Sequence, residues 1–161
     1  MNSLLLTVAA LRMLVPRAIV AEVLGSSLLD FVRDETSGLV FFGWRGRRVP
    51  LLGGATVGAA HAPETTERIG ERTGEGTDQE SKIAIFHGLR HPQQLPFYGF
   101  MTTRNPRLLR VDEDDVEEIA GVPLHPAELM RIRVDGNEAC IPRIDHFEST
   151  LVELMKPAVT R

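Results

Sequence analysis

The amino-acid sequence predicts a mainly β protein made of two small barrels, with one or two short helices. Three observations lead to this fold class. Short apolar runs rich in β-branched and aromatic residues recur along the chain, each about the length of one strand. Turn signals containing glycine or proline separate these runs. A sustained helical pattern occurs only near the end of the chain. We therefore interpret the short apolar runs as strands and expect about nine of them.

The composition is that of an ordinary soluble globular protein. Of its 161 residues, 43% are hydrophobic and 25% are charged, enough for one domain or two small, intimately packed ones. The 22 acidic and 18 basic residues give a formal net charge of −4, which provides no global field for nucleic acid or anionic lipid. Cys140 is the only cysteine, which excludes an intrachain disulfide and a Cys-built zinc site.

The first apolar run is interrupted early by Arg12, and no basic residue precedes it. A membrane-spanning helix needs about 20 apolar residues, and a signal peptide needs a charged start. We therefore expect a cytoplasmic protein without direct membrane insertion.

The first third of the chain predicts two strand pairs separated by a helical turn. Residues 4–8 and 12–15 are apolar runs separated by two alanines, which indicates a tight turn between two strands. Pro16 begins a short helical pattern that Gly25 ends. After a polar loop, residues 38–52 read GLVFFGWRGRRVPLL, which predicts a strand, a turn at Arg45-Gly46 and a second strand.

A low-complexity acidic segment, residues 62–81, divides the chain. It contains six acidic residues, two arginines and a single aliphatic residue, Ile69, so it cannot bury enough surface to offset its ordering entropy. We interpret it as a disordered linker between lobes of about 1–60 and 82–161, within one domain spanning 1–161. The alternative, an ordered charged helix, is disfavoured by three glycines, each costing about 1 kcal/mol in a helix.

The second lobe predicts three strands, at residues 82–86, 97–102 and 107–111, followed by a hairpin and a helix. Asp135-Gly136 is typical of a two-residue type I′ turn. Counting outward from this turn pairs Val134 with Asn137, Arg133 with Glu138, Ile132 with Ala139 and Met130 with Ile141.

The last element is a predicted helix over 145–155. Phe147, Leu151, Leu154 and Met155 give it an apolar stripe, and Pro157 ends it.

No catalytic or metal motif is complete. GGATVG at 53–58 lacks the third glycine of a dinucleotide loop, and His87 and His91 lack the glutamate of a zinc-protease helix. The acidic run at 112–118 lacks the spacing of a calcium loop, so a solvated helical turn is the simpler interpretation. Cys140 is expected within a strand, although Asp145 and His146 supply the partners of a thiol nucleophile. We therefore expect neither catalysis nor a cofactor nor a metal.

Residues 45–48, RGRR, form a local basic patch beside Phe41, Phe42 and Trp44. Small barrels use such patterns on single-stranded nucleic acid, so a small nucleic-acid-binding β-barrel is the alternative function. The rest of the chain offers no extended basic groove, which makes this alternative weaker. The patch also has a purely structural interpretation, in which the aromatic rings fill a core and the arginines are solvated.

The same segment, Gly43-Trp44-Arg45-Gly46-Arg47-Arg48-Val49-Pro50-Leu51-Leu52, resembles the midpoint signature of the CheW family of chemotaxis adaptors. The similarity extends over most of the chain. LLLTVAALRMLVPRAIVAEVL resembles the opening strand pair and short helix of the family, YGFMTTRNPRLLRVDEDDV its later strands, and MRIRVDGNEACIPRIDHF its terminal hairpin and last helix. Gly53-Gly54 stands where the family usually has Asp-Leu, and the acidic segment replaces the helix and loop that follow. With these two departures the chain resembles divergent pilus-type adaptors of the ChpC and PilI kind.

The resemblance implies two intertwined five-stranded SH3-like barrels and a non-enzymatic role in a bacterial chemosensory array. The implied partners are the regulatory domain of a CheA-type histidine kinase, the cytoplasmic tip of a chemoreceptor, and other CheW-like proteins. The adaptor would be cytoplasmic and recruited to membrane-associated receptor arrays, with a pilus-based (twitching) output. Arg45 carries over as a partner-binding residue. The resemblance also implies that three residues lie near the kinase interface: Val49, Leu51 and Leu52. Packing in the core is an equally good interpretation for each of them.

Overall fold

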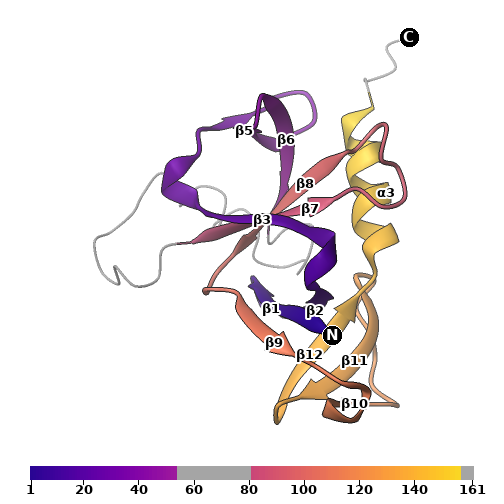
Figure 1. The fold of residues 1–161 in the computed structure, drawn as a ribbon. Helices are drawn as coiled ribbons and strands as arrows, with labels where there is room; N and C mark the ends of the chain where they lie inside the picture. Colours follow the sequence, from indigo (N-terminus) through magenta and orange to yellow (C-terminus); the bar gives the residue numbers. More distant parts are fainter. Residues whose placement is uncertain (54–80, 157–161) are drawn as a thin grey trace.

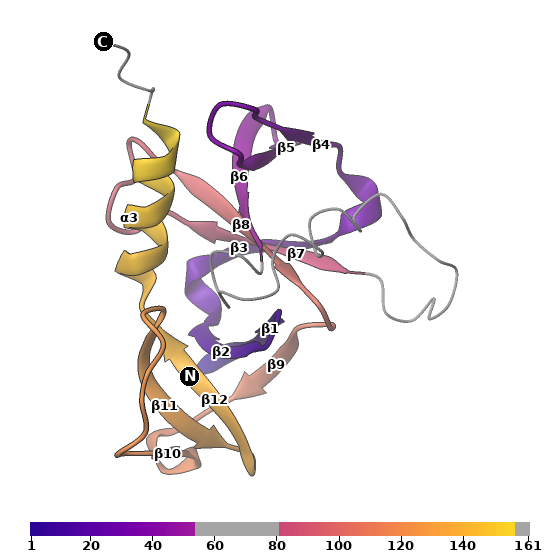
Figure 2. The same cartoon turned by 180° about the vertical axis from the view of Figure 1, so that it is seen from behind.

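The computed structural model describes residues 1–53 and 81–156, which form two six-stranded sheets and one α-helix, α3 (Ile144–Met155) (Figures 1 and 2). The first sheet has the order β10-β11-β12-β2-β1-β9, and the second has the order β3-β7-β8-β6-β5-β4. The strands of the first sheet are β1 (Asn2–Val8), β2 (Leu11–Pro16), β9 (Arg107–Arg110), β10 (Val116–Glu118), β11 (Glu128–Val134) and β12 (Asn137–Pro142). Those of the second are β3 (Val20–Gly25), β4 (Phe31–Arg33), β5 (Val40–Trp44), β6 (Arg47–Leu52), β7 (Lys82–His87) and β8 (Phe97–Thr102).

The predicted mainly β architecture of two small β units with a short helix is confirmed. Each sheet has six strands where five were expected, and the three-residue strands β4 and β10 each lie at a sheet edge. Runs this short carry too little alternation for the sequence pattern to predict a strand. In the acidic run at 112–118, a 3-10 turn (Glu113–Asp115) with a capping box between Asp112 and Asp115 precedes β10.

The two sheets are intertwined, because each combines strands from both ends of the chain. β1 and β2 pair with β9 and β12, whereas β3 and β6 pair with β7 and β8. The expected lobes, 1–60 and 82–161, therefore do not coincide with the sheets. Strand pairing across the chain, rather than proximity in sequence, sets the structural units.

One predicted element is wrong: the helical pattern after Pro16 is mostly a strand. Only Arg17–Ile19 form a 3-10 turn, and residues 20–25 form β3, antiparallel to β7. Two valines in this segment suit a sheet, and β7 supplies the backbone hydrogen-bond partners that a local pattern cannot reveal.

The predicted terminal hairpin is confirmed in turn and register. Asp135 and Gly136 have φ values of 52° and 75°, as a type I′ turn requires. The four predicted cross-strand pairs of β11 and β12 all occur. Because turn type and register depend on neighbouring residues, the sequence carried enough information for this element.

A central core joins the two sheets and α3. Its side chains come from both strand sets and from the helix, and the largest of them are fully or nearly fully buried: Leu6, Met13, Phe86, Tyr98, Phe100, Phe147 and Leu151. Smaller clusters lie on the other face of each sheet. The predicted helix is confirmed, and Phe147 and Leu151 face the core as expected, whereas Leu154 is exposed.

A buried glutamate attaches α3 to the second sheet. The Glu148 carboxylate accepts hydrogen bonds from the backbone N–H groups of Leu89 and Arg90, at 3.0 and 2.7 Å, and from the Tyr98 hydroxyl at 3.0 Å. Burial, together with the Glu148 charge, raises the pKa of Tyr98 above its ordinary value, which keeps the hydroxyl a donor. Figures 1 and 2 show α3 alongside the β7–β8 loop that carries these N–H groups.

Two predictions fall largely outside the described residues: the linker at 62–81, except for Ser81, and the GGATVG segment after Gly53. Within the described ranges, no helix has the length and apolar character needed to cross a membrane.

Candidate functional site

The β5–β6 hairpin presents Arg45 at its tip. Trp44 pairs with Arg47, so the loop has two residues, Arg45 and Gly46, with φ values of 48° and 72°. Positive φ at both positions is the type I′ geometry, and a non-glycine residue seldom adopts it. The predicted strand-turn-strand is therefore confirmed, and the turn places the Arg45 side chain outside the sheet.

Two neighbours hold Arg45 in place. Its Nη2 lies 3.1 Å from Oε1 of Glu22 on β3, and its guanidinium lies 4.7 Å from the centre of the Trp44 ring. Trp44 Nε1 donates a hydrogen bond to the same Glu22 oxygen at 3.0 Å. The Arg45 side chain nevertheless remains 69% exposed. The hairpin thus offers an ordered guanidinium whose remaining N–H groups can bind a carboxylate on a partner.

The sequence pattern alone does not single out Glu22. It lies in the segment that was predicted to be helical, where an acidic side chain between aliphatic residues carries no specific signal. Only the placement of β3 in the second sheet brings it to the β5–β6 turn. We name the cluster of Glu22, Trp44 and Arg45 the hairpin-tip cluster.

The other three predicted partner-binding residues are buried. Val49 and Leu51 fill the smaller core of the second sheet, and Leu52 belongs to the central core. Their side chains offer no surface to a partner in this conformation. Among the four predicted residues, Arg45 alone has an exposed side chain, and the other three anchor β6, one of the two strands of the hairpin that carries it.

The two remaining arginines of the basic patch cover aromatic rings. The Arg48 guanidinium lies 3.8 Å from the centre of the Phe41 ring, and that of Arg47 lies 5.4 Å from the centre of the Phe97 ring. Phe41 and Trp44 are themselves buried, as the structural interpretation expects. Stacking of nucleic-acid bases needs open ring faces, so these rings give the nucleic-acid alternative no support.

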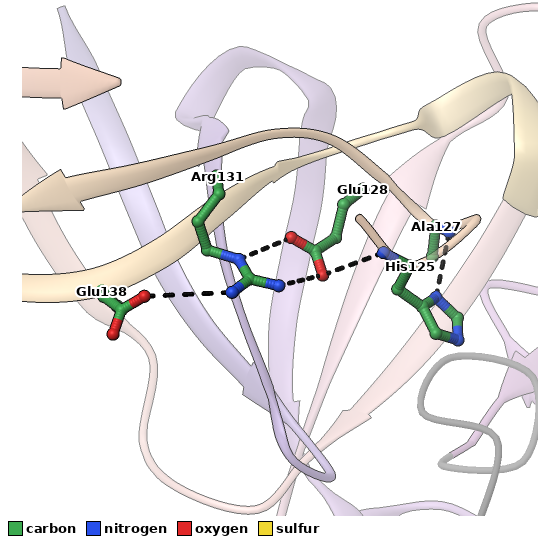
Figure 3. Close-up of polar contacts among 5 residues, drawn as sticks. All are labelled: His125, Ala127, Glu128, Arg131 and Glu138. Atoms are coloured by element: carbon green, nitrogen blue, oxygen red, sulfur yellow. Dashed lines mark hydrogen bonds and ion pairs between the residues drawn. The ribbon is translucent and has the colours of Figure 1, made fainter. Parts of the chain in front are cut away.

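A second polar cluster lies on the first sheet around Glu128, which is only 5% exposed. Both of its oxygens accept hydrogen bonds from Arg131 at 2.8 Å, and the backbone N–H of His125 donates at 3.3 Å (Figure 3). Hydrogen bonding from Arg131 is the main reason that the pKa of Glu128 lies below its ordinary value. Nη1 of Arg131 also lies 3.9 Å from Oε1 of Glu138.

This Glu128 cluster has the character of a structural ion pair. Ala127 N–H donates to His125 Nδ1 at 3.0 Å, so the imidazole closes the bend before β11 (Figure 3). Every oxygen of Glu128 has a donor, and a bidentate pair of this kind is stable only while both partners remain. The cluster fixes the start of β11, where the pairing with β12 has a register shift.

The weaker chemical candidates do not assemble into a site. Cys140 is buried in β12, and burial raises the pKa of its thiol to about 12, with a smaller contribution from the Glu128 charge. A thiol with this pKa is protonated and unreactive at neutral pH. In residues 1–53 and 81–156, no group of three or more His, Cys, Asp or Glu side chains could hold a metal ion.

Comparison with known proteins tests the fold. No protein-family model matches the sequence, and no curated protein matches it. The crystal structure of the scaffolding protein TtCheW from Thermoanaerobacter tengcongensis is similar, with a TM-score of 0.59 over 88% of each chain. The chain has the CheW fold. Sequence identity to TtCheW is 15%, so the likeness is one of fold, as the sequence resemblance predicts.

Proposed function

We propose that this protein is a non-enzymatic adaptor of a bacterial chemosensory array. It would couple the cytoplasmic tips of chemoreceptors to the regulatory domain of a CheA-type histidine kinase. The observation that carries the proposal is the CheW fold, which spans 88% of this chain and of the scaffolding protein TtCheW.

The hairpin-tip cluster supports the adaptor role. Its ordered, exposed Arg45 can recognise a carboxylate on a partner without a large entropic cost of ordering, because Glu22 and Trp44 already restrict the side chain. The one carboxylate of the cluster, Glu22, accepts hydrogen bonds from Trp44 and Arg45, so the arrangement suits binding by Arg45. We therefore place partner recognition at this hairpin.

The proposal includes a pilus-based output and a cytoplasmic location at receptor arrays. The sequence departure at Gly53-Gly54, which resembles pilus-type adaptors, supports the pilus assignment. Other CheW-like proteins are proposed as further partners within the same array.

A co-sedimentation assay tests the bridging role. Membranes that contain the chemoreceptor are mixed with the cognate CheA-type kinase and with this protein, and the kinase in the pellet is measured. We expect the kinase to sediment with receptor membranes only when this protein is present. Receptor-free membranes are the control. Equal kinase sedimentation with and without the protein would contradict an adaptor role.

A further inference from the structure

We propose that the first sheet carries a binding cleft for a small ligand with at least two phosphate or carboxylate groups. The cleft, of about 590 Å³, lies beside the β1–β2 turn and the β8–β9 loop. Its lining includes Arg12 of β2, Arg104 of the β8–β9 loop and Arg107 of β9. The hairpin-tip cluster belongs to the second sheet, so this site is independent of the proposed adaptor contact.

Strand register brings two of these arginines to one face of the sheet. Arg12 is opposite Thr7 of β1, and Arg107 is opposite Leu5 of β1. Leu5 and Thr7 are two residues apart, so they project from the same face, and residues directly opposite them share that face. Adjacent strands lie about 4.8 Å apart and residues about 3.4 Å apart along a strand, so the two arginine backbones, two strands and two residues apart, are separated by about 12 Å. Side chains on both sides of β1 can thus reach one ligand.

The cleft has a local excess of positive charge. Among the described residues that line it, none is Asp or Glu. The side chains of Arg12 and Arg104 make no ion pair or hydrogen bond with another residue of the described ranges. Arg107 lies 3.7 Å from Asp135, but both side chains are more than half exposed. Surface pairs of this kind are weak, so an anionic ligand can displace Asp135.

The backbone around the cleft is held in place, and neutral polar groups complete the lining. Thr103 N–H donates to the Thr7 carbonyl at 2.8 Å, which attaches the β8–β9 loop to β1. The Asn137 side chain donates to the Asp135 carbonyl at 3.0 Å, at the β11–β12 turn. Asn105 and Asn137 supply amide groups beside the arginines, whereas the Thr103 hydroxyl already donates to the Thr7 carbonyl at 3.4 Å. Such groups orient a ligand that the charges attract.

The dimensions and chemistry select the ligand class. Pockets of about 300–1,000 Å³ accommodate small molecules, and this cleft lies within that range. Guanidinium groups bind phosphate and carboxylate groups through paired hydrogen bonds. Arginines on both sides of β1 favour a ligand with two separated anionic groups over a single monovalent anion.

Calorimetric titration of the full chain tests this proposal, with tripolyphosphate and citrate as separate probes. We expect saturable 1:1 binding of at least one probe, and the stronger of the two identifies the phosphate or carboxylate class. Arg12→Gln and Arg104→Gln should each weaken binding about tenfold or more, since each removes charge-assisted hydrogen bonds. Arg104 is an exposed loop residue, so its variant remains informative if Arg12→Gln does not fold.

The matched control is Arg90→Gln, at an exposed arginine of the β7–β8 loop outside the cleft lining. Its affinity should equal that of the wild type. Absence of saturable binding for both probes overturns the proposal. An equal loss in Arg90→Gln also overturns it, because that result would mean attraction to overall charge rather than to the cleft.

Discussion

At the scale of the residue, the neighbours of Arg45 determine which substitution can test its role. The sequence resemblance marks Arg45 as a partner-binding residue, but only the structure reveals its ion pair with Glu22. A charge reversal at position 45 would place a carboxylate beside Glu22, so it would disturb the hairpin as well as a partner contact. Arg45→Asn is the cleaner variant, because asparagine tolerates the left-handed backbone that position 45 adopts.

Glu128 leads to a prediction about pH. Its folded pKa is lower than its ordinary value of 4.5, so near that pH the unfolded chain binds more protons than the folded one. The stability from Glu128 is therefore fully present above pH 4.5 and is lost as the pH falls through the lower folded pKa. Glu128→Gln should cost about 1–3 kcal/mol at neutral pH, and the difference from wild type should shrink on acidification.

Urea unfolding at several pH values measures this difference. Glu138→Gln is the control, because Glu138 is exposed and lies 3.9 Å from Arg131, so its loss should change stability by less than about 0.5 kcal/mol. A wild-type-minus-Glu128→Gln difference that stays constant down to pH 2 would contradict the assigned role of the Glu128 cluster.

At the scale of elements, residues close together in the sequence determine the terminal hairpin, whereas a distant strand determines the conformation of β3. The β11–β12 hairpin depends on Asp135-Gly136 and its adjacent residues, so turn and register could be predicted. The pattern of Ile19, Val20 and Val23 at the start of β3 suits a helix face equally well, and the true partner of β3, β7, lies about sixty residues further along. Local patterns cannot decide between a helix and a strand when the deciding contact is distant.

The hairpin yields a stability prediction. Gly136→Val should destabilise the protein by more than about 1 kcal/mol, because Gly136 has a φ of 75° and a β-branched residue resists positive φ. Gly43→Val is the matched control. Gly43 lies in β5 with open space where a Cβ would stand and without a positive φ, so this change should be tolerated. Thermal melts compare the two variants, and equal midpoints would show that the turn does not constrain the hairpin.

At the scale of the whole molecule, the sequence supports the fold class but not the assembly of its sites. Short runs and turn residues predict two small β units and the last helix. The division into sheets could not be predicted, because β1 and β2 pair with strands more than one hundred residues away. Pairing between strands that are distant in the chain also creates the hairpin-tip cluster and the arginine-lined cleft, whereas the Glu128 cluster comes from residues 125–138, around the local β11–β12 hairpin. In the hairpin-tip cluster and the cleft, residues far apart in the sequence come together only through the topology of the fold.

Calorimetric titration against the regulatory domain of the cognate CheA-type kinase tests the adaptor proposal most directly. The wild type should bind, and Arg45→Asn should bind about 30-fold or more weakly, because loss of one partner of an interfacial charge pair costs about 2–5 kcal/mol. Its melting temperature should change little, since the Arg45 side chain is mostly exposed and Trp44 remains a hydrogen-bond donor to Glu22. Arg33→Gln, at an exposed arginine of β4, should bind like the wild type. Absence of wild-type binding, or equal affinities for wild type and Arg45→Asn, would contradict partner recognition at the hairpin tip.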